Sequence, residues 1–270
     1  MSAQTSYSNR PAHAFAGQLA DTGPRRVISC IAAIALAAGL LVVKSTSGEQ
    51  RITAPSAPDA DGDAIIATGG STGGIQTLTG VALDGVVGDD VMAVPRNVTL
   101  TFSSHANWDA TVAVVTGKDA DGATVTENFS IPDGGGATVT GAVLFRQITS
   151  LVIPAQSGTA GTFTMGTGSL LGSIDREVRG ITLYESMREP GLFAADTQVA
   201  VIRQGRVWVS AETAVAEGDP VYVRLVAGTG ETAGALRATP DANDCVRLNG
   251  ARFASTTTGA GLAVVELNLP

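Results

Sequence analysis

The sequence has very few of the side chains that most enzymes use for proton transfer or nucleophilic attack. Only two histidines, His13 and His105, occur among 270 residues, so a histidine-based relay has few candidates. No Gly-x-Ser-x-Gly motif is present, and the Gly-Thr-Gly runs at 166–168 and 228–230 lack the third glycine of a dinucleotide-binding loop. We therefore expect that the protein is not an enzyme and has no catalytic residues.

Cysteines and metal-binding motifs are also scarce. Cys30 and Cys245 lie far apart and outside any Cys-x-x-Cys motif, and a chain of this length does not need a disulfide to fold. We expect two free thiols, with one long-range disulfide as the open alternative. The aspartates within 59–63 resemble the start of a calcium loop, but the twelfth position is Gly70 instead of a glutamate. We therefore expect no metal and no other cofactor.

Charged and aromatic residues make up only 16% and 4% of the chain, which is untypical of disordered chains and of coiled coils. Hydrophobic residues reach 44% and glycine occurs 33 times. This composition favours many short strands of small aliphatic residues, separated by frequent turns. The formal net charge is −8, and an acidic body argues against nucleic-acid binding, which depends on clustered lysine and arginine.

Charge and glycine divide the chain into three parts. Residues 61–173 hold three basic and ten acidic residues, a net charge of −7, together with 19 of the 33 glycines. The flanking parts, 1–60 and 174–270, carry net charges of +2 and −3. This break in composition predicts that 61–173 is inserted into a base domain made of residues 27–60 and 174–270.

The inserted block shows a regular series of strand patterns. Two runs rich in β-branched residues, 111–116 and 123–131, surround a loop that ends in Asp121-Gly122, which is typical of a β-hairpin. Further strands are expected at 98–102, 145–153 and 162–165. Short strands alternating with turn clusters are the pattern of an Ig-like β-sandwich.

The base domain is expected to be rich in strands and barrel-like, so the predicted fold class is all-β. In its C-terminal part, 199–202 and 206–210 are expected to form a hairpin around Gln204-Gly205, followed by strands at 221–225 and 262–269. Residues 27–43 form a long apolar run that Gly39 divides into two expected strands. The alternative is that this run is a signal-peptide core or a short membrane-spanning helix.

The first 26 residues show no sustained periodicity and predict an extended N-terminal arm. Burying one large apolar side chain contributes about 1.5–3 kcal/mol, whereas ordering one backbone residue costs about 1–2 kcal/mol. We therefore expect residues 1–26 either to be disordered or to become ordered only against a neighbouring subunit. The candidate interface residues are three apolar or aromatic anchors and three arginines that could pair with acidic neighbours: Tyr7, Phe15, Leu19, Arg10, Arg25 and Arg26.

Several short motifs resemble one family of phage proteins. The opening resembles the start of the structural cement (capsid decoration) proteins of tailed phages, and three later runs continue the resemblance in the same order. The motifs are YSNRPA at 7–12, AGQLAD at 16–21, GRVWV at 205–209, EGDPVYVR at 217–224 and GLAVVEL at 261–267. They lie outside 61–173, which departs from the shorter family pattern.

This resemblance implies a function, a location and partners. A cement protein is a virion structural protein that is made in the host cytoplasm and binds the outer surface of the phage head. There it stabilises contacts between major capsid subunits, commonly as a homotrimer, and it binds neither nucleic acid nor a membrane. The alternative function is a membrane-anchored or exported bacterial Ig-like surface protein, with residues 27–43 in or across the membrane.

The domain division can be tested on the inserted block alone. If 61–173 is an autonomous β-sandwich, the isolated fragment should give a β-rich far-UV circular dichroism spectrum and a single cooperative thermal transition. A random-coil spectrum without such a transition would show that the block depends on the rest of the chain.

Overall fold

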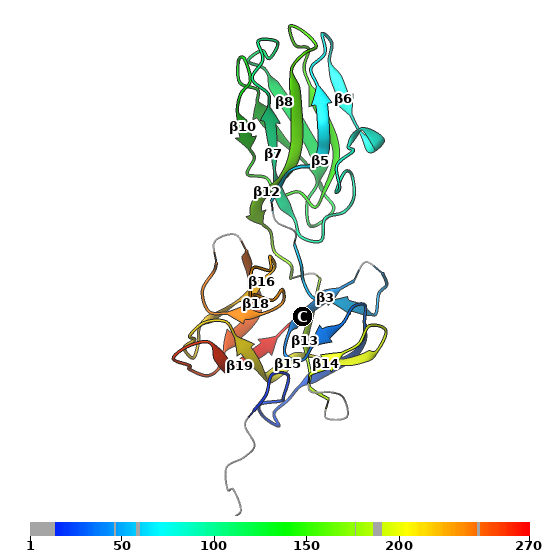
Figure 1. Ribbon diagram of the computed structural model, residues 1–270. Coiled ribbons are helices and arrows are strands. Elements are labelled where there is room, and N and C mark those ends of the chain that lie inside the picture. Colours follow the sequence, from blue (N-terminus) through cyan, green and yellow to red (C-terminus); the bar gives the residue numbers. More distant parts are fainter. Residues whose placement is uncertain (1–13, 46, 58–59, 176, 186–190, 242–243) are drawn as a thin grey trace, which may run out of the picture.

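The computed structural model describes residues 14–270 except 46, 58–59, 176, 186–190 and 242–243. Strands account for 48% of the residues and helices for 1%, which confirms the all-β prediction. Figure 1 shows two stacked parts, here called the base and the sandwich. The base contains both described ends of the chain, and two chain segments connect it to the sandwich.

The base is one nine-stranded sheet that closes on itself twice. Its order is β1-β4-β3-β13-β15-β17-β16-β18-β19, with additional pairings of β1 and of β19 with β15. The strands are β1 (Arg26–Ala32), β3 (Leu41–Lys44), β4 (Arg51–Thr53), β13 (Val178–Thr182), β15 (Gln198–Ala211), β16 (Pro220–Arg224), β17 (Leu236–Arg237), β18 (Cys245–Phe253) and β19 (Gly261–Asn268). A separate small sheet pairs β2 (Leu36–Ala37) with β14 (Leu192–Phe193).

The two extra pairings create two closed five-stranded rings that share β15. The first ring consists of β1, β4, β3, β13 and β15, and the second of β15, β17, β16, β18 and β19. Closing a sheet removes its unpaired edges, and each ring surrounds its own apolar side chains. The barrel-like base predicted from the sequence is therefore confirmed as a barrel with additional strands, built on one common strand.

Strand β15 corrects the hairpin that we predicted around Gln204-Gly205. It runs uninterrupted through 14 residues. Its first half pairs with β1 from Gln198 to Gln204, and its second half pairs with β19 from Gln204 to Ala211. The glycine supports a strained strand position and not a turn. Gly205 has a φ of 116°, and a side chain there would approach Arg25 and Ile202 within 3.1–3.2 Å.

Each ring has a core of the small aliphatic residues expected from the composition. In the first ring, Cys30, Ala32, Val42, Ile52 and Val201 pack together. The larger core extends through the second ring and the outer side of the first ring, from Leu41 and Ile181 to Phe253 and Val265. Cys30 and Cys245 are both buried and free, as the sequence predicted. Burial raises the pKa of both thiols.

The apolar run at 27–43 enters this core as strands. It contributes most of β1, all of β2 and most of β3, and Gly39 turns the chain between β2 and β3 with a φ of 79°. Two strands divided at Gly39 were predicted for this segment, and β1 and β3 confirm them. Among the residues that the structure describes, no helix is long and apolar enough to span a membrane.

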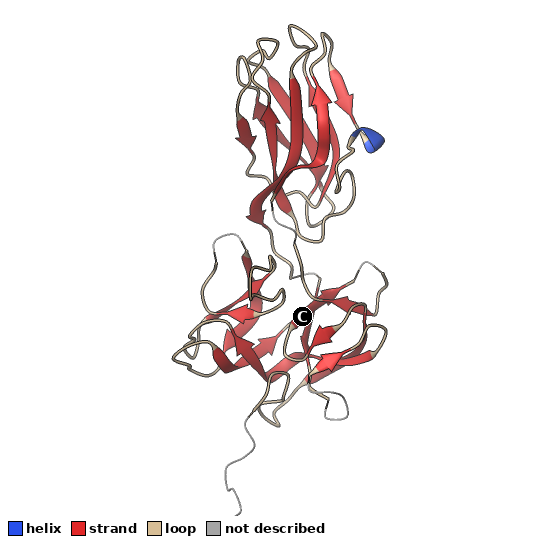
Figure 2. Ribbon diagram, viewed as in Figure 1, coloured by secondary structure: helices blue, strands red, loops and turns tan. Residues whose placement is uncertain are grey.

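The sandwich consists of two four-stranded antiparallel sheets that face each other (Figure 2). One has the order β10-β7-β12-β5 and the other β6-β11-β8-β9. The strands are β5 (Asp61–Gly70), β6 (Gln76–Leu78), β7 (Arg96–Phe102), β8 (Val112–Lys118), β9 (Thr124–Ser130), β10 (Thr138–Thr140), β11 (Gln147–Ile153) and β12 (Thr162–Leu171), with one 3-10 turn, η1 (Gly80–Ala82). All the strands predicted in this block are present, including the β8–β9 hairpin.

Aromatic residues fill the centre of the sandwich. Trp108 is fully buried and packs edge-on against Phe102 and Phe163, with ring centroids 4.9 and 6.1 Å away. Such pairs add about 0.5–1.5 kcal/mol beyond the burial of their surface. Of the chain's few aromatic residues, several are thus concentrated in this core.

A buried arginine closes the second ring where its smallest strand, β17, joins β15. Arg224 is 1% exposed, and its guanidinium group reaches Glu212, Glu231 and Asp241 at 2.8–2.9 Å. Arg237 of β17 adds a 2.6 Å contact to Asp241. The hydrogen bonds from Arg224 and Arg237 lower the pKa of Asp241. This network holds Glu231 and Asp241, which flank β17 in the sequence, against the barrel.

Removing this arginine should destabilise the base strongly. Arg224→Met leaves three carboxylates facing each other without their main partner, and breaking a buried ion pair costs about 3–5 kcal/mol. We expect a decrease in melting temperature of roughly 6 °C or more. The control is Arg252→Met, because Arg252 pairs with Glu266 while 62% exposed and should cost less than about 1 kcal/mol. Equal melting temperatures for the two variants would contradict the role of the network.

Candidate functional site

The described part of the N-terminal segment lies along β15 of its own chain. Gly17 N–H donates to Trp208 O at 2.7 Å, Trp208 N–H donates to Gln18 O at 2.8 Å, and Ala20 N–H donates to Arg206 O at 3.0 Å. Leu19 pairs opposite Val207. This segment and β1 therefore follow the same edge of β15 in the same direction, with residues 21–25 bulging out between them.

This placement corrects the predicted arm in its described part. We expected residues 1–26 to become ordered only against a neighbouring subunit, but 14–21 already pack on the base and Arg26 begins β1. Residues 14–21 are ordered without a neighbouring subunit because β15 of the same chain supplies the backbone hydrogen bonds. For residues 1–13, the crossing onto a neighbouring subunit stays a prediction. This segment, which includes Tyr7 and Arg10, lies outside the described residues.

Two of the predicted anchors contact the base directly. The Phe15 ring lies 4.1 Å from the Tyr184 ring, centroid to centroid, and remains 39% exposed. Leu19 is half-buried and packs against the main core. Leu19 therefore acts as part of the fold, while Phe15 keeps enough free surface to contact a partner.

A close crossing of two backbones holds this segment in place. Gly17 and Gly39 have φ values of 83° and 79°, and both pack where a side chain would clash. A Cβ on Gly39 would lie 2.6 Å from the Ala16 Cβ, and a Cβ on Gly17 would lie 2.7 Å from the Tyr184 nitrogen. Tyr184 N–H donates to Gly17 O at 2.9 Å. Glycine is needed at both positions for conformation and for space.

The predicted arginines lie at the bulge. Arg25 and Arg26 are exposed, and neither forms an ion pair with any residue that the structure describes. The nearby Arg206 is different, because it pairs with Glu266 at 2.8 Å and lies 3.8 Å from Asp21. Arg25 and Arg26 are therefore available to a partner, as an interface requires.

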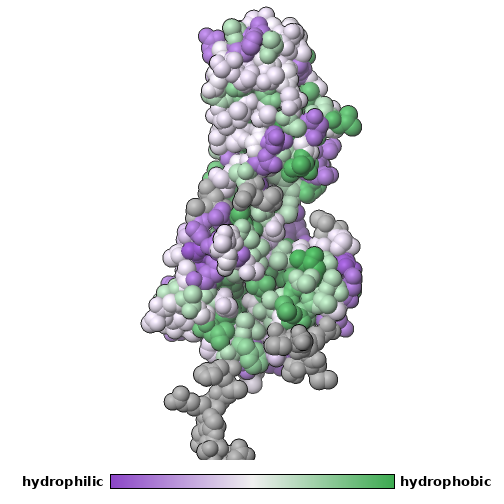
Figure 3. All heavy atoms as spheres, viewed as in Figure 1, coloured by the Kyte–Doolittle hydropathy of each residue, from purple (hydrophilic) through white to green (hydrophobic). Residues whose placement is uncertain are grey.

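Large apolar side chains are exposed on both parts of the molecule. Figure 3 shows hydrophobic surface gathered on the base. The exposed large apolar residues of the base are Phe15 (39%), Val27 (41%), Ile34 (48%), Leu192 (60%) and Leu262 (38%). On the sandwich, the segment from Ile75 to Val91 exposes four aliphatic side chains, and Val81 is 99% exposed. Where such residues form a contiguous patch, they are typical of a protein-binding face.

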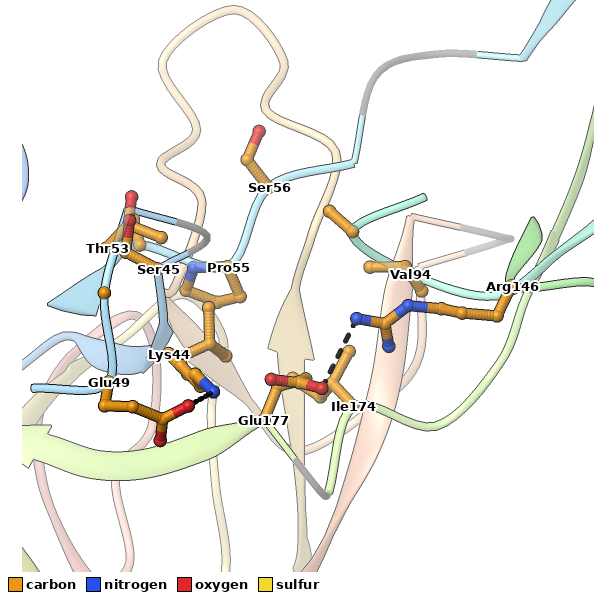
Figure 4. A pocket seen from close by; sticks show the side chains of 14 residues that line it. Lys44, Ser45, Glu49, Thr53, Pro55, Ser56, Val94, Arg146, Ile174 and Glu177 are labelled. Carbon is orange, nitrogen blue, oxygen red and sulfur yellow. Dashed lines mark hydrogen bonds and ion pairs between the residues drawn. The ribbon is translucent and has the colours of Figure 1, made fainter. Parts of the chain in front are cut away.

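A cavity of about 650 Å³ lies between the base and the sandwich (Figure 4). Val94, Pro55 and Ile174 contribute to its apolar wall. Arg146 of the sandwich reaches across to Glu177 of the base at 3.3 Å, and both side chains are mostly buried. On the base side, Lys44 pairs with Glu49. These charged groups, which line the cavity, are thus paired with one another. Such pairing is typical of a structural junction and not of a reactive site.

Packing strengthens this junction, because Val94 of the sandwich part belongs to the main core of the base. Beside the two connecting segments, Ala57 N–H donates to Leu225 O within the base at 2.9 Å, and Gly172 N–H donates to Pro95 O within the sandwich part at 2.8 Å. The sequence did not reveal the junction, because Arg146 and Glu177 are 31 residues apart and each resembles an ordinary surface charge.

Among the described residues, no group of three or more histidine, cysteine or acidic side chains could hold a metal ion. Asp61 and Asp63 from the calcium-like run lie close together, and the hydrogen bond and charge of Asp61 raise the pKa of Asp63. Asp59 lies outside the described residues. The nearest resemblance to a metal site in the sequence therefore provides only two described carboxylates.

One comparison with known proteins connects this architecture to a family. Residues 153–268 match the model of the structural cement protein family (E217 gp24/Pam3 gp6). The match begins at the end of β11, includes β12 and covers β13 to β19. It confirms the family resemblance indicated by the sequence motifs and implies a structural role in a phage virion. None of the curated proteins compared with the chain matches it.

The glycine crossing provides a direct test of how the N-terminal segment is held. Gly39→Ala should weaken the base by about 1–3 kcal/mol through overpacking and should speed amide hydrogen exchange at Gly17, Ala20 and Trp208. The control is Gly218→Ala, because Gly218 also has a positive φ, of 92°, but has no atom within 4 Å of the added Cβ. It should show backbone strain without faster exchange at the three amides. Equal exchange in both variants would contradict the crossing.

Proposed function

We propose that the protein binds the outer surface of a phage head and stabilises contacts between major capsid subunits, with the base as the binding part. The observation that carries this proposal is the position of the family match. It covers all the base strands from β13 onwards, including β15, but only the last complete strand of the sandwich. The family's function is therefore expected to reside in the base.

The surface of the base supports binding to another protein. It combines exposed apolar residues such as Phe15 and Leu192 with the unpaired charges of Arg25 and Arg26. Protein interfaces commonly combine large apolar side chains with arginine. We propose the major capsid protein as the partner, and a homotrimer as the arrangement in which three bases would contact adjacent capsid subunits.

The sandwich would then project from the particle. Its segment, 61–173, carries a net charge of −7, and like-charge repulsion would keep particles apart in solution. We propose that it is an Ig-like domain, supported by its two facing antiparallel sheets. The junction salt bridge between Arg146 and Glu177 would hold it in a constant orientation on the base.

The geometry favours a structural function over catalysis. The cavity between the base and the sandwich is lined by charged groups that pair with each other, and the buried thiols have raised pKa values that disfavour the reactive thiolate. The alternative of a membrane-anchored or exported surface protein required residues 27–43 in or across a membrane, and the structure places them in β1, β2 and β3.

Binding to undecorated heads tests the proposal. The charge-reversal variant Arg25→Glu/Arg26→Glu should occupy heads at least about tenfold less than the wild type, because it replaces two exposed positive charges of the base by negative ones. The control is Lys118→Glu, which makes the same kind of change at an exposed strand end of the sandwich. Occupancy is measured by gel densitometry of purified particles, and head stability by resistance to heat.

The outcomes separate the claims. Failure of the wild-type protein to bind heads would contradict the proposed function. If the wild type binds but the base variant decorates equally well, the two arginines do not belong to the interface. If Lys118→Glu alone lowers the occupancy, the sandwich and not the base contacts the capsid.

A further inference from the structure

Three arginines converge on a bulge in β15, at the end of the first ring. The register between β1 and β15 passes from Val27 opposite Ile202 to Arg26 opposite Gln204, so Arg203 is the extra residue of this bulge. On the other edge of β15, β13 approaches so closely that a Cβ on Gly180 would lie 2.1 Å from Ile202 O. This contact brings Arg179 beside the same bulge. We call Arg26, Arg179 and Arg203 the arginine cluster.

Electrostatic coupling agrees with this placement. Burial first, and then the charges of Arg26 and Arg179, lower the pKa of Arg203. Arg179 and Arg203 also act on the buried thiol of Cys30. Burial raises the pKa of this thiol, and the charges of the two arginines offset part of that increase. The charges of Arg179 and Arg203 are therefore near enough to the core of the first ring to act on the Cys30 thiol.

The cluster lacks acidic side-chain partners among the described residues, in a chain that has many acids. The protein has 25 acidic and 17 basic residues, and other arginines of the base, such as Arg51, Arg206 and Arg224, form ion pairs. No acidic side chain among the described residues pairs with Arg26, Arg179 or Arg203. Arg203 Nη2 donates to an oxygen of Pro270, the last residue of the sequence, while its buried Nε has no acceptor among the described residues.

The nearby acid Glu49 does not fill this role. The pKa of Glu49 is lowered first by its hydrogen bond to Lys44 and only last by the charge of Arg179. Its carboxylate pairs with Lys44. Three positive charges brought together with no acidic side chain paired to them among the described residues repel one another, and the fold tolerates this cost at a position where the side chains remain partly accessible.

We propose that the arginine cluster is an oxyanion-binding site. Guanidinium groups bind carboxylate and phosphate oxygens through paired N–H donors, and a bound anion would relieve the repulsion among the three arginines. The oxyanion could come from free phosphate or from the acidic side chains of a bound protein segment. Both present the same oxygen chemistry, and the site is independent of whether the protein decorates a head.

The experiment compares the wild type with Arg179→Gln/Arg203→Gln, which retains polar side chains and removes two of the three charges. Isothermal titration with inorganic phosphate and with hexaglutamate, each at constant ionic strength and pH, measures the two sources separately. We expect the double variant to weaken binding of the effective ligand at least tenfold. Arg247→Gln, which removes an exposed charge from β18, is the matched control and should bind like the wild type.

Thermal unfolding provides a second readout. Phosphate stabilises proteins generally by exclusion from their surface, so the informative quantity is the additional increase in melting temperature of the wild type over the double variant. Without ligand, the double variant loses both the repulsion among the arginines and the hydrogen bond from Arg203 to Pro270, so each protein's melting temperature without phosphate is its own baseline. Arg179→Lys/Arg203→Lys keeps the charges without the paired donors and should bind with intermediate affinity.

Binding of phosphate alone would identify a free anion as the ligand, and binding of hexaglutamate would identify an acidic protein segment. Absence of binding by both would overturn the proposal. Equal affinity in the wild type and in the double glutamine variant would overturn it as well, because the anion would then be held elsewhere.

Discussion

The base depends on one continuous backbone ladder along β15. Each of its two edges is paired by different strands in its two halves: β1 and the N-terminal segment follow one edge, and β13 and β19 follow the other. Both rings close only because this strand belongs to both. A break near Gly205 would therefore open two barrels together, which couples the stability of the N-terminal segment to that of the C-terminal strands.

This coupling suits a protein that must resist force at an interface. Closed rings leave few free edges, and the buried Arg224 network fastens the second ring at its shortest strand. The sandwich is attached through two chain crossings, a salt bridge and shared core contacts. A rigid base and a firmly attached acidic outer part are consistent with the structural role in a virion that the family match implies.

The sequence predicted the elements better than their connections. Runs of β-branched residues such as those in β7, β8 and β19 predicted strands correctly, because alternating apolar residues reflect one buried face. The hairpin at Gln204-Gly205 was wrong, because a glycine that permits close packing inside a strand has the same local signature as one in a turn. The sharing of β15 by two rings depends on pairings between residues far apart in the sequence, which local patterns do not contain.

In the candidate interface, too, local features could be predicted from the sequence but contacts between distant residues could not. The structure leaves the predicted interface residues Phe15, Arg25 and Arg26 exposed, and their contact with a partner stays a prediction. Leu19 instead packs on its own base, because the backbone of β15 offers partners that a sequence pattern cannot reveal. The arginine cluster and the junction bridge were missed, since each joins residues from separate strands or from the two parts of the molecule.

The most direct test of the account is a cryo-EM map of a phage head decorated with this protein. The account predicts density for the two-ring base in contact with capsid subunits on both sides of a subunit boundary, and density for the sandwich farther from the shell. A map in which the sandwich contacts the shell and the base points into solvent, or in which the protein lies elsewhere in the virion, would contradict the account.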